Sequence, residues 1–91
     1  MQTQRVVITG LGAVSPNGIT VKEFWNSLIN GKSGIGPMTL CDPSGYTCRI
    51  AGEILDFDPS VAIDFKESRR MARFSQLAVV AGKEALINSG L

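Results

Sequence analysis

Residues 77–82 constrain most strongly what this chain can fold into. They belong to a long segment with helical periodicity, in which one stripe consists of Met71, Phe74, Ala78, Ala81 and Ala85. Leu77, Val79 and Val80 point away from that stripe, so residues 77–82 are apolar on nearly every side. Helices of this kind are buried inside larger proteins. The pattern therefore predicts a helix that must be covered on more than one face.

A second segment, near the N-terminus, is also predicted to be covered on more than one face. Three consecutive β-branched residues, Val6, Val7 and Ile8, predict a strand over residues 5–9 that is buried on both faces of a parallel sheet. The chain offers at most one other short strand, at residues 48–54. We therefore expect an α/β fold in which residues 1–91 form an incomplete N-terminal segment, and the rest of a longer chain supplies the missing neighbours.

Capping residues predict two helices. Thr20 and Glu23 have the spacing of a capping box at the start of a helix that Gly31 ends. Asp64 and Glu67 repeat this spacing, which predicts a second long helix that runs to about residue 89. The other expected features are a loop at 11–19, an irregular loop at 31–47, the short strand at 48–54, one helical turn at 61–63 and a helix stop at Gly90.

Charge and hydropathy exclude several classes of protein. Nine basic and eight acidic residues leave a net charge of +1, which gives no field to attract nucleic acid or an anionic membrane. The longest apolar run has five residues, whereas a membrane span needs roughly 18 or more. The first residues also lack the apolar core of a signal peptide. We therefore expect a cytoplasmic protein.

Histidine is absent, and this is the most restrictive count in the composition. Without histidine the chain has no Ser–His or Cys–His catalytic pair and no histidine-based metal site. Cys41 and Cys48 lie too far apart for a CxxC pair, and we expect them to be small, semi-buried side chains rather than nucleophiles. The sequence therefore predicts no catalytic residue and no metal ligand among these residues.

The glycine-rich segment at residues 9–15 allows two interpretations. Gly10 and Gly12 follow the expected strand, as in a dinucleotide-binding fingerprint, and Ser15 nearly serves as its third small residue. However, Pro16 and an Asn-Gly turn follow, so no helix N-terminus comes directly after the glycines to bind a phosphate. A tight structural loop at a strand end is the favoured interpretation.

Lys66, Arg69, Arg70 and Arg73 form a basic patch. Their spacing places them on one face at the start of the second expected helix. Residues 64–73 carry four bases and two acids, so the excess positive charge of the whole chain lies here. One interpretation is a solvated charged face, and the other is a docking site for an acidic partner or a phosphate. Arg73 is one turn further along, where it could instead pack internally.

Five stretches of the chain, taken in sequence order, resemble the N-terminal part of a β-ketoacyl-[acyl-carrier-protein] synthase, the condensing enzyme of fatty-acid synthesis. The resemblance covers essentially the whole chain, and the DFDP and KESRRM pieces look more like the type II elongation enzymes. The stretches are RVVITGLGAVSPNG (5–18), FWNSLINGKSGI (24–35), AGEILDFDP (51–59), KESRRMARF (66–74) and EALINSGL (84–91).

The resemblance implies a thiolase-like, layered α/β/α/β/α fold built from two similar halves, normally as a homodimer. It also implies an acyltransferase that condenses an acyl thioester with malonyl-acyl carrier protein and uses no metal or organic cofactor. The family's catalytic cysteine and two histidines match nothing in this chain. Lys66, Arg69 and Arg70 correspond to the positions through which the family docks its acidic carrier protein, whereas Arg73 is a weaker candidate.

Two alternatives stay open at this point. One is a non-catalytic ketosynthase-like partner of the chain-length-factor type, because the residues that would separate it from an active enzyme are not among these 91. The other, less favoured, is a piece of a nucleotide-binding dehydrogenase, which rests on the glycine loop alone.

Overall fold

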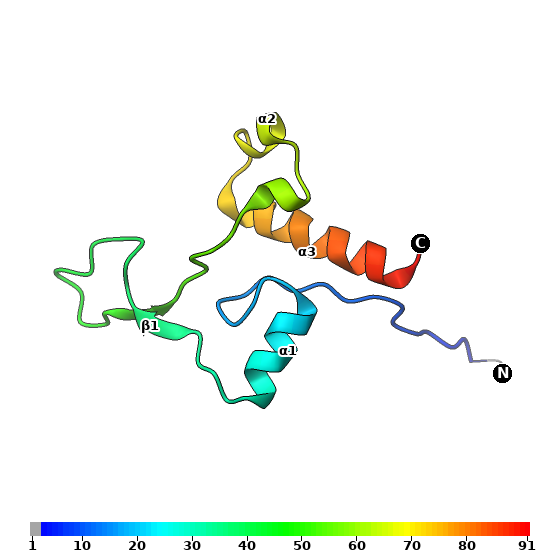
Figure 1. Cartoon of the computed structure of the whole chain (residues 1–91), viewed down its shortest axis with the longest axis horizontal. Coiled ribbons are helices and arrows are strands. Elements are labelled where there is room, and N and C mark those ends of the chain that lie inside the picture. Colours follow the sequence, from blue (N-terminus) through cyan, green and yellow to red (C-terminus); the bar gives the residue numbers. More distant parts are fainter. Residues whose placement is uncertain (1–2) are drawn as a thin grey trace.

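Figure 1 shows the chain as a computed structural model, which describes residues 3–91. The elements are, in order, α1 (Val21–Ile29), β1 (Ile35–Pro37), β2 (Ile50–Gly52), a 3₁₀ turn η1 (Pro59–Val61), α2 (Phe65–Ser68) and α3 (Arg73–Ser89). In this view the β1–β2 hairpin extends to the left, and α1 and α2 lie on opposite sides of the molecule.

Much of the surface that this arrangement creates is left uncovered. The radius of gyration is 16.6 Å, whereas a compact domain of this length has about 12 Å. The accessible surface is 7410 Å², compared with about 5,100 Å² for a compact protein of this mass. Within residues 3–91 the buried apolar side chains are Ile63 and Val80, where α3 packs against η1. The hydrophobic core is therefore small.

The predicted strand at residues 5–9 does not form. This segment is extended but unpaired, and Val6 and Ile8 are 92% and 82% exposed. A strand requires a neighbour that accepts and donates its backbone hydrogen bonds. The two strands among the described residues, β1 and β2, pair with each other and leave no partner for residues 5–9. The expectation of a buried parallel strand is therefore wrong for this chain by itself.

The β1–β2 hairpin corrects one prediction and confirms another. β2 lies inside the strand expected at 48–54, but β1 lies inside the segment expected to be an irregular loop. The two strands are antiparallel, with Gly36 opposite Ala51. Each has only three residues, and β1 contains Gly36 and Pro37, so its sequence carries no strand signal of its own.

The first helix forms as predicted. The Thr20 side chain accepts a hydrogen bond of 3.2 Å from the backbone N–H of Glu23, and the Glu23 carboxylate accepts one of 3.1 Å from the N–H of Ile19. These contacts satisfy backbone donors at the helix N-terminus. Gly31 follows the last turn with φ +68°, a conformation that glycine adopts without strain.

The second predicted helix is two helices. α2 ends at Ser68, the chain turns at residues 69–72, and α3 begins at Arg73. The expected capping box is wrong because the Asp64 side chain makes no capping hydrogen bond. The turn is stabilised instead by a hydrogen bond of 2.7 Å from Gln76 Nε2 to the carbonyl of Ser68. Gly90 ends α3 with φ +78°, as predicted.

Three further details complete the helical region. The helical turn expected at 61–63 forms at Pro59–Val61, where the Asp58 side chain accepts a hydrogen bond of 2.9 Å from the N–H of Ser60. Phe74, expected on the same stripe as Met71, is 76% exposed. Within residues 3–91, no helix has both the length and the apolar character needed to cross a bilayer.

Candidate functional site

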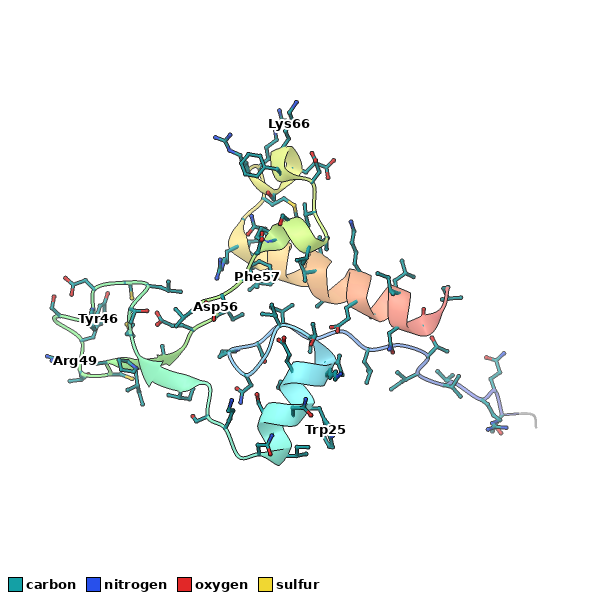
Figure 2. All side chains as sticks on the ribbon, in the orientation of Figure 1. Trp25, Tyr46, Arg49, Asp56, Phe57 and Lys66 are labelled. Carbon is teal, nitrogen blue, oxygen red and sulfur yellow. The ribbon has the colours of Figure 1, made fainter. Side chains whose placement is uncertain are left out.

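Lys66, Arg69 and Arg70 come together on the surface at α2 and the turn that follows it. The three side chains are exposed and line one shallow hollow of about 340 Å³. In Figure 2 Lys66 lies at the outer tip of the molecule, pointing away from α3. The grouping predicted from the sequence is therefore present for these three residues, although the long helix that was expected to carry them is interrupted.

A buried anchor holds this basic cluster in place. Ser68 is 5% exposed, and its hydroxyl donates a hydrogen bond of 2.9 Å to the carbonyl of Phe65. The guanidinium of Arg69 lies over the ring of Phe65, 5.6 Å from its centroid, which favours one orientation of the arginine. The cations therefore project from α2 and the turn that follows it, where Ser68 is packed inside and the three charged side chains are open to solvent.

Arg73 does not belong to this cluster. Its guanidinium lies 5.2 Å from the centroid of the Phe57 ring and donates a hydrogen bond of 2.6 Å to the carbonyl of Ile54. These contacts connect the start of α3 to the segment between β2 and η1. Arg73 therefore packs against the rest of the chain, the second of the two roles that the sequence left open for it.

The glycine loop contacts α3 rather than a ligand. A Cβ atom added at Gly12 would lie 1.8 Å from the carbonyl oxygen of Ala81, and one added at Gly10 would lie 2.2 Å from that of Ala85. The absence of a side chain is thus required for the backbone of this loop to approach the helix. In Figure 1 the N-terminal segment (blue) runs alongside α3. This geometry agrees with the structural interpretation of the loop.

Glu84 connects the glycine loop, α1 and α3. Its carboxylate accepts hydrogen bonds of 2.9 Å from the N–H of Ala13 and 3.0 Å from the N–H of Val21, the first residue of α1. An acidic side chain at a helix N-terminus also interacts favourably with the helix dipole. Sequence reasoning missed this role. The one available signal was an acidic residue next to the apolar segment 77–82.

The hollow near this loop has no feature of a nucleotide site. It has a volume of about 540 Å³ between residues 15–19 and the hairpin, and none of its lining residues is a lysine or arginine. Two of its carboxylates already accept hydrogen bonds from backbone N–H groups, Glu23 from Ile19 and Glu53 from Leu40. A negatively charged hollow of this kind repels phosphate.

Glu53 holds residues 39–40, at the start of the loop between β1 and β2. Its carboxylate accepts hydrogen bonds from the N–H of Leu40 at 2.7 Å and from the hydroxyl of Thr39 at 2.8 Å. The hydrogen bond from Leu40 is the main reason why the pKa of Glu53 is lower than its ordinary value of 4.5. The carboxylate therefore holds residues 39–40 in place while it is ionised.

Cys41 and Cys48 are both exposed free thiols in this loop, which corrects the expectation that they are semi-buried. Twelve residues, 38–49, form the loop between β1 and β2, and such loops run over the surface. The described part of the chain holds no cluster of three or more histidine, cysteine, aspartate or glutamate side chains that could bind a metal ion.

Comparison with known proteins gives a consistent result. Residues 3–91 match the family described as Beta-ketoacyl synthase, N-terminal domain. The chain is 44% identical over 91 residues to 3-oxoacyl-[acyl-carrier-protein] synthase 2 of Synechocystis sp. and 45% identical over 91 residues to that of Coxiella burnetii. Each alignment covers 100% of this chain and 22% of the relative, so the chain spans about a fifth of the length of these proteins.

A solved structure agrees in fold. The structure titled "The ishigamide ketosynthase/chain length factor" superposes with a TM-score of 0.80 at 34% identity, covering 93% of this chain and 21% of the other. This likeness extends the sequence match to the arrangement of the elements. The chain belongs to the β-ketoacyl synthase family and corresponds to the N-terminal part of its N-terminal domain, a thiolase-like fold.

Proposed function

We propose that this chain is the N-terminal segment of a type II β-ketoacyl-[acyl-carrier-protein] synthase that elongates fatty acids. The observation that carries the proposal is the identity of 44–46% over essentially the whole chain to proteins named 3-oxoacyl-[acyl-carrier-protein] synthase 2. The proposal includes the layered α/β/α/β/α fold for the whole protein, a homodimer and a cytoplasmic location. Residues 1–91 are then one part of its ketosynthase domain.

The proposed reaction has two stages. An acyl group passes from its carrier protein to a cysteine thiolate, and malonyl-carrier protein then loses CO₂ to give a carbanion that attacks the acyl thioester. The product is a β-ketoacyl-carrier protein two carbons longer. Two histidines polarise the malonyl thioester carbonyl and assist decarboxylation. Since this chain contains no histidine, we assign the chemistry to the remainder of the protein.

We assign docking of the acyl carrier protein to Lys66, Arg69 and Arg70. Acyl carrier proteins are strongly acidic, and the three exposed cations around one hollow provide the complementary charge. Exposed ion pairs contribute only about 0.2–1 kcal/mol each, so their main effects are on the encounter rate and its salt dependence. The segment would therefore recruit the substrate that the rest of the protein converts.

Charge reversal in the full-length synthase tests this assignment. The double variant Arg69→Glu/Arg70→Glu loses two attractive contacts, worth together about 0.4–2 kcal/mol, so KM for acyl-carrier protein should rise about 2- to 30-fold. The penalty should shrink with added salt, because the Debye length falls to roughly 3 Å at 1 M. Activity toward a short pantetheine thioester, which lacks the acidic carrier, should remain unchanged.

A matched control separates local docking from overall charge. Lys22→Glu/Lys32→Glu makes the same change in net charge, at two exposed lysines on the α1 side of the molecule. This variant should leave KM for the carrier substrate nearly unchanged. Equal losses on the carrier substrate and the pantetheine thioester would show that Arg69 and Arg70 have a structural role, and the docking proposal would then be wrong.

The second candidate is a non-catalytic partner of the chain-length-factor type. It is favoured by the likeness to the solved protein whose title names both a ketosynthase and a chain length factor. The full-length sequence distinguishes the two candidates. An active synthase requires a cysteine in a turn of small residues, followed by two histidines, whereas a chain-length-factor-like protein lacks the cysteine.

A further inference from the structure

Three sulfur-containing residues line one hollow at the hairpin loop. Met38 directly follows β1, and Cys41 and Cys48 lie in the loop between β1 and β2. The three residues line one hollow of about 320 Å³, together with Tyr46 and Thr47. Cys41 Sγ lies 3.2 Å from Met38 Sδ, and both cysteines are free and exposed. Neither cysteine has a role in the proposed synthase reaction.

Backbone and carboxylate hydrogen bonds help to hold this loop in place. The backbone N–H of Met38 donates a hydrogen bond of 2.9 Å to the carbonyl of Arg49, which continues the strand pairing past β1. The carboxylate of Glu53 holds Leu40, and a backbone hydrogen bond of 3.1 Å closes the turn at 43–46. In Figure 2 Tyr46 and Arg49 both lie in this loop, apart from α1 and α3. The loop therefore keeps Cys41 and Met38 in sulfur contact, while the Cys48 thiol, on the same hollow, donates a hydrogen bond of 3.5 Å to the carbonyl of Ile50.

The chemistry of these ligands selects a soft metal ion. Thiolate and thioether sulfur favour Cu(I), whereas Mg²⁺ and Ca²⁺ require oxygen ligands. Structural zinc sites use four ligands, generally cysteine and histidine, and the five residues that line this hollow include two cysteines and neither a histidine nor a carboxylate. We propose that Met38, Cys41 and Cys48 form a three-sulfur binding site for one Cu(I) ion.

Binding requires no change of oxidation state. The two thiols lose their protons to solvent, and each thiolate donates an electron pair to Cu(I), while the neutral thioether donates a third. The resulting site carries one net negative charge. Because two protons are released for each ion bound, the affinity should rise with pH.

The test uses the full-length protein, kept reduced under anaerobic conditions and titrated with Cu(I) against a chromophoric Cu(I) chelator. Full-length protein can hold other thiols, so the measurement is the difference between the wild type and Cys41→Ser/Cys48→Ser. We expect the double variant to bind one Cu(I) fewer per chain. Met38→Leu keeps the side-chain volume and should weaken binding about tenfold or more without changing the stoichiometry. Met71→Leu, remote from the hollow, should bind as the wild type does.

Several results would overturn the proposal. The first is equal Cu(I) binding by the wild type and the double cysteine variant. An unchanged affinity in Met38→Leu would remove the thioether from the site and with it the three-sulfur arrangement. A Zn²⁺ ion that is retained in competition with Cu(I) would contradict the selection of a soft ion. Circular dichroism of each variant confirms that the fold is retained, and the exposed positions of both cysteines make serine an acceptable replacement.

Discussion

Replacing Gly12 by alanine should detach the glycine loop from α3. The added Cβ would lie 1.8 Å from the carbonyl oxygen of Ala81, whereas ordinary contacts begin at 3.4 Å, so one of the two backbones must move by about 1.6 Å. Both atoms involved are held by the backbone, and α3 is a continuous helix of 17 residues at this point. The loop is therefore the part that moves.

The cost follows from the contacts next to Gly12. The adjacent N–H of Ala13 donates a hydrogen bond of 2.9 Å to the Glu84 carboxylate, and a displacement of this size breaks it. A hydrogen bond to a charged group contributes about 1.5–3 kcal/mol, and overpacking of a close contact costs about 1–3 kcal/mol. We expect the free energy of unfolding to fall by a few kcal/mol, a large part of the about 5–15 kcal/mol that stabilises a typical domain.

Thermal unfolding and amide hydrogen exchange of the full-length protein measure the two effects. Gly12→Ala should lower Tm and accelerate exchange at Ala13. Gly36→Ala is the control, because a Cβ added there meets no atom within 4 Å and the residue lies outside the apolar segment 77–82. If both variants show the same Tm and the same exchange at Ala13, the packing of the loop on α3 is not what requires glycine.

Other expectations concern the same contacts. Glu84→Gln should lower Tm and accelerate amide exchange at Val21. The glutamine NH₂ group cannot accept a hydrogen bond, so one of the two N–H groups, of Ala13 or Val21, loses its acceptor. Unchanged exchange at Val21 would contradict this prediction. The depressed pKa of Glu53 means that its contribution to stability is complete above 4.5 and is lost as the pH falls below it. As the pH falls below 4.5, amide exchange at Leu40 should accelerate relative to its intrinsic rate. In Glu53→Gln the same change of pH should cause no such acceleration, because the carboxylate is already absent. Residues 1–91 alone should show no cooperative urea transition as a monomer by circular dichroism.

The elements that the sequence predicts well are those with local causes. α1 is determined by the Thr20–Glu23 contacts at one end and by the left-handed glycine after the other. Gly90 ends α3 for the same reason. All of these signals lie within four residues of the helix ends that they determine. The basic cluster belongs to the same class, because Lys66, Arg69 and Arg70 are neighbours in sequence as well as in space.

The elements that the sequence predicts poorly depend on distant contacts. The break between α2 and α3 is stabilised by Arg73 bonding to Ile54 and by Gln76 bonding to Ser68. Neither contact has a periodic or capping signature, and the spacing of Asp64 and Glu67 is compatible with an uninterrupted helix. Glu84 acts on residues more than 60 positions away, so nothing near it in the sequence indicated its partners.

The basic cluster and the exposed apolar segments differ in whether they need further polypeptide to form. The cluster is formed by contacts within this chain, because Ser68 of α2 is already only 5% exposed and bonds to the carbonyl of Phe65. Residues 5–9 instead have the composition of a strand buried on both faces, yet here Val6 is 92% exposed. Only additional strands and helices could bury such a segment, since the backbone groups at its edges need hydrogen-bond partners as well. Under the proposed function, the carrier-docking surface would therefore be complete in this segment, whereas the sheet that includes residues 5–9 would need strands from the rest of the protein.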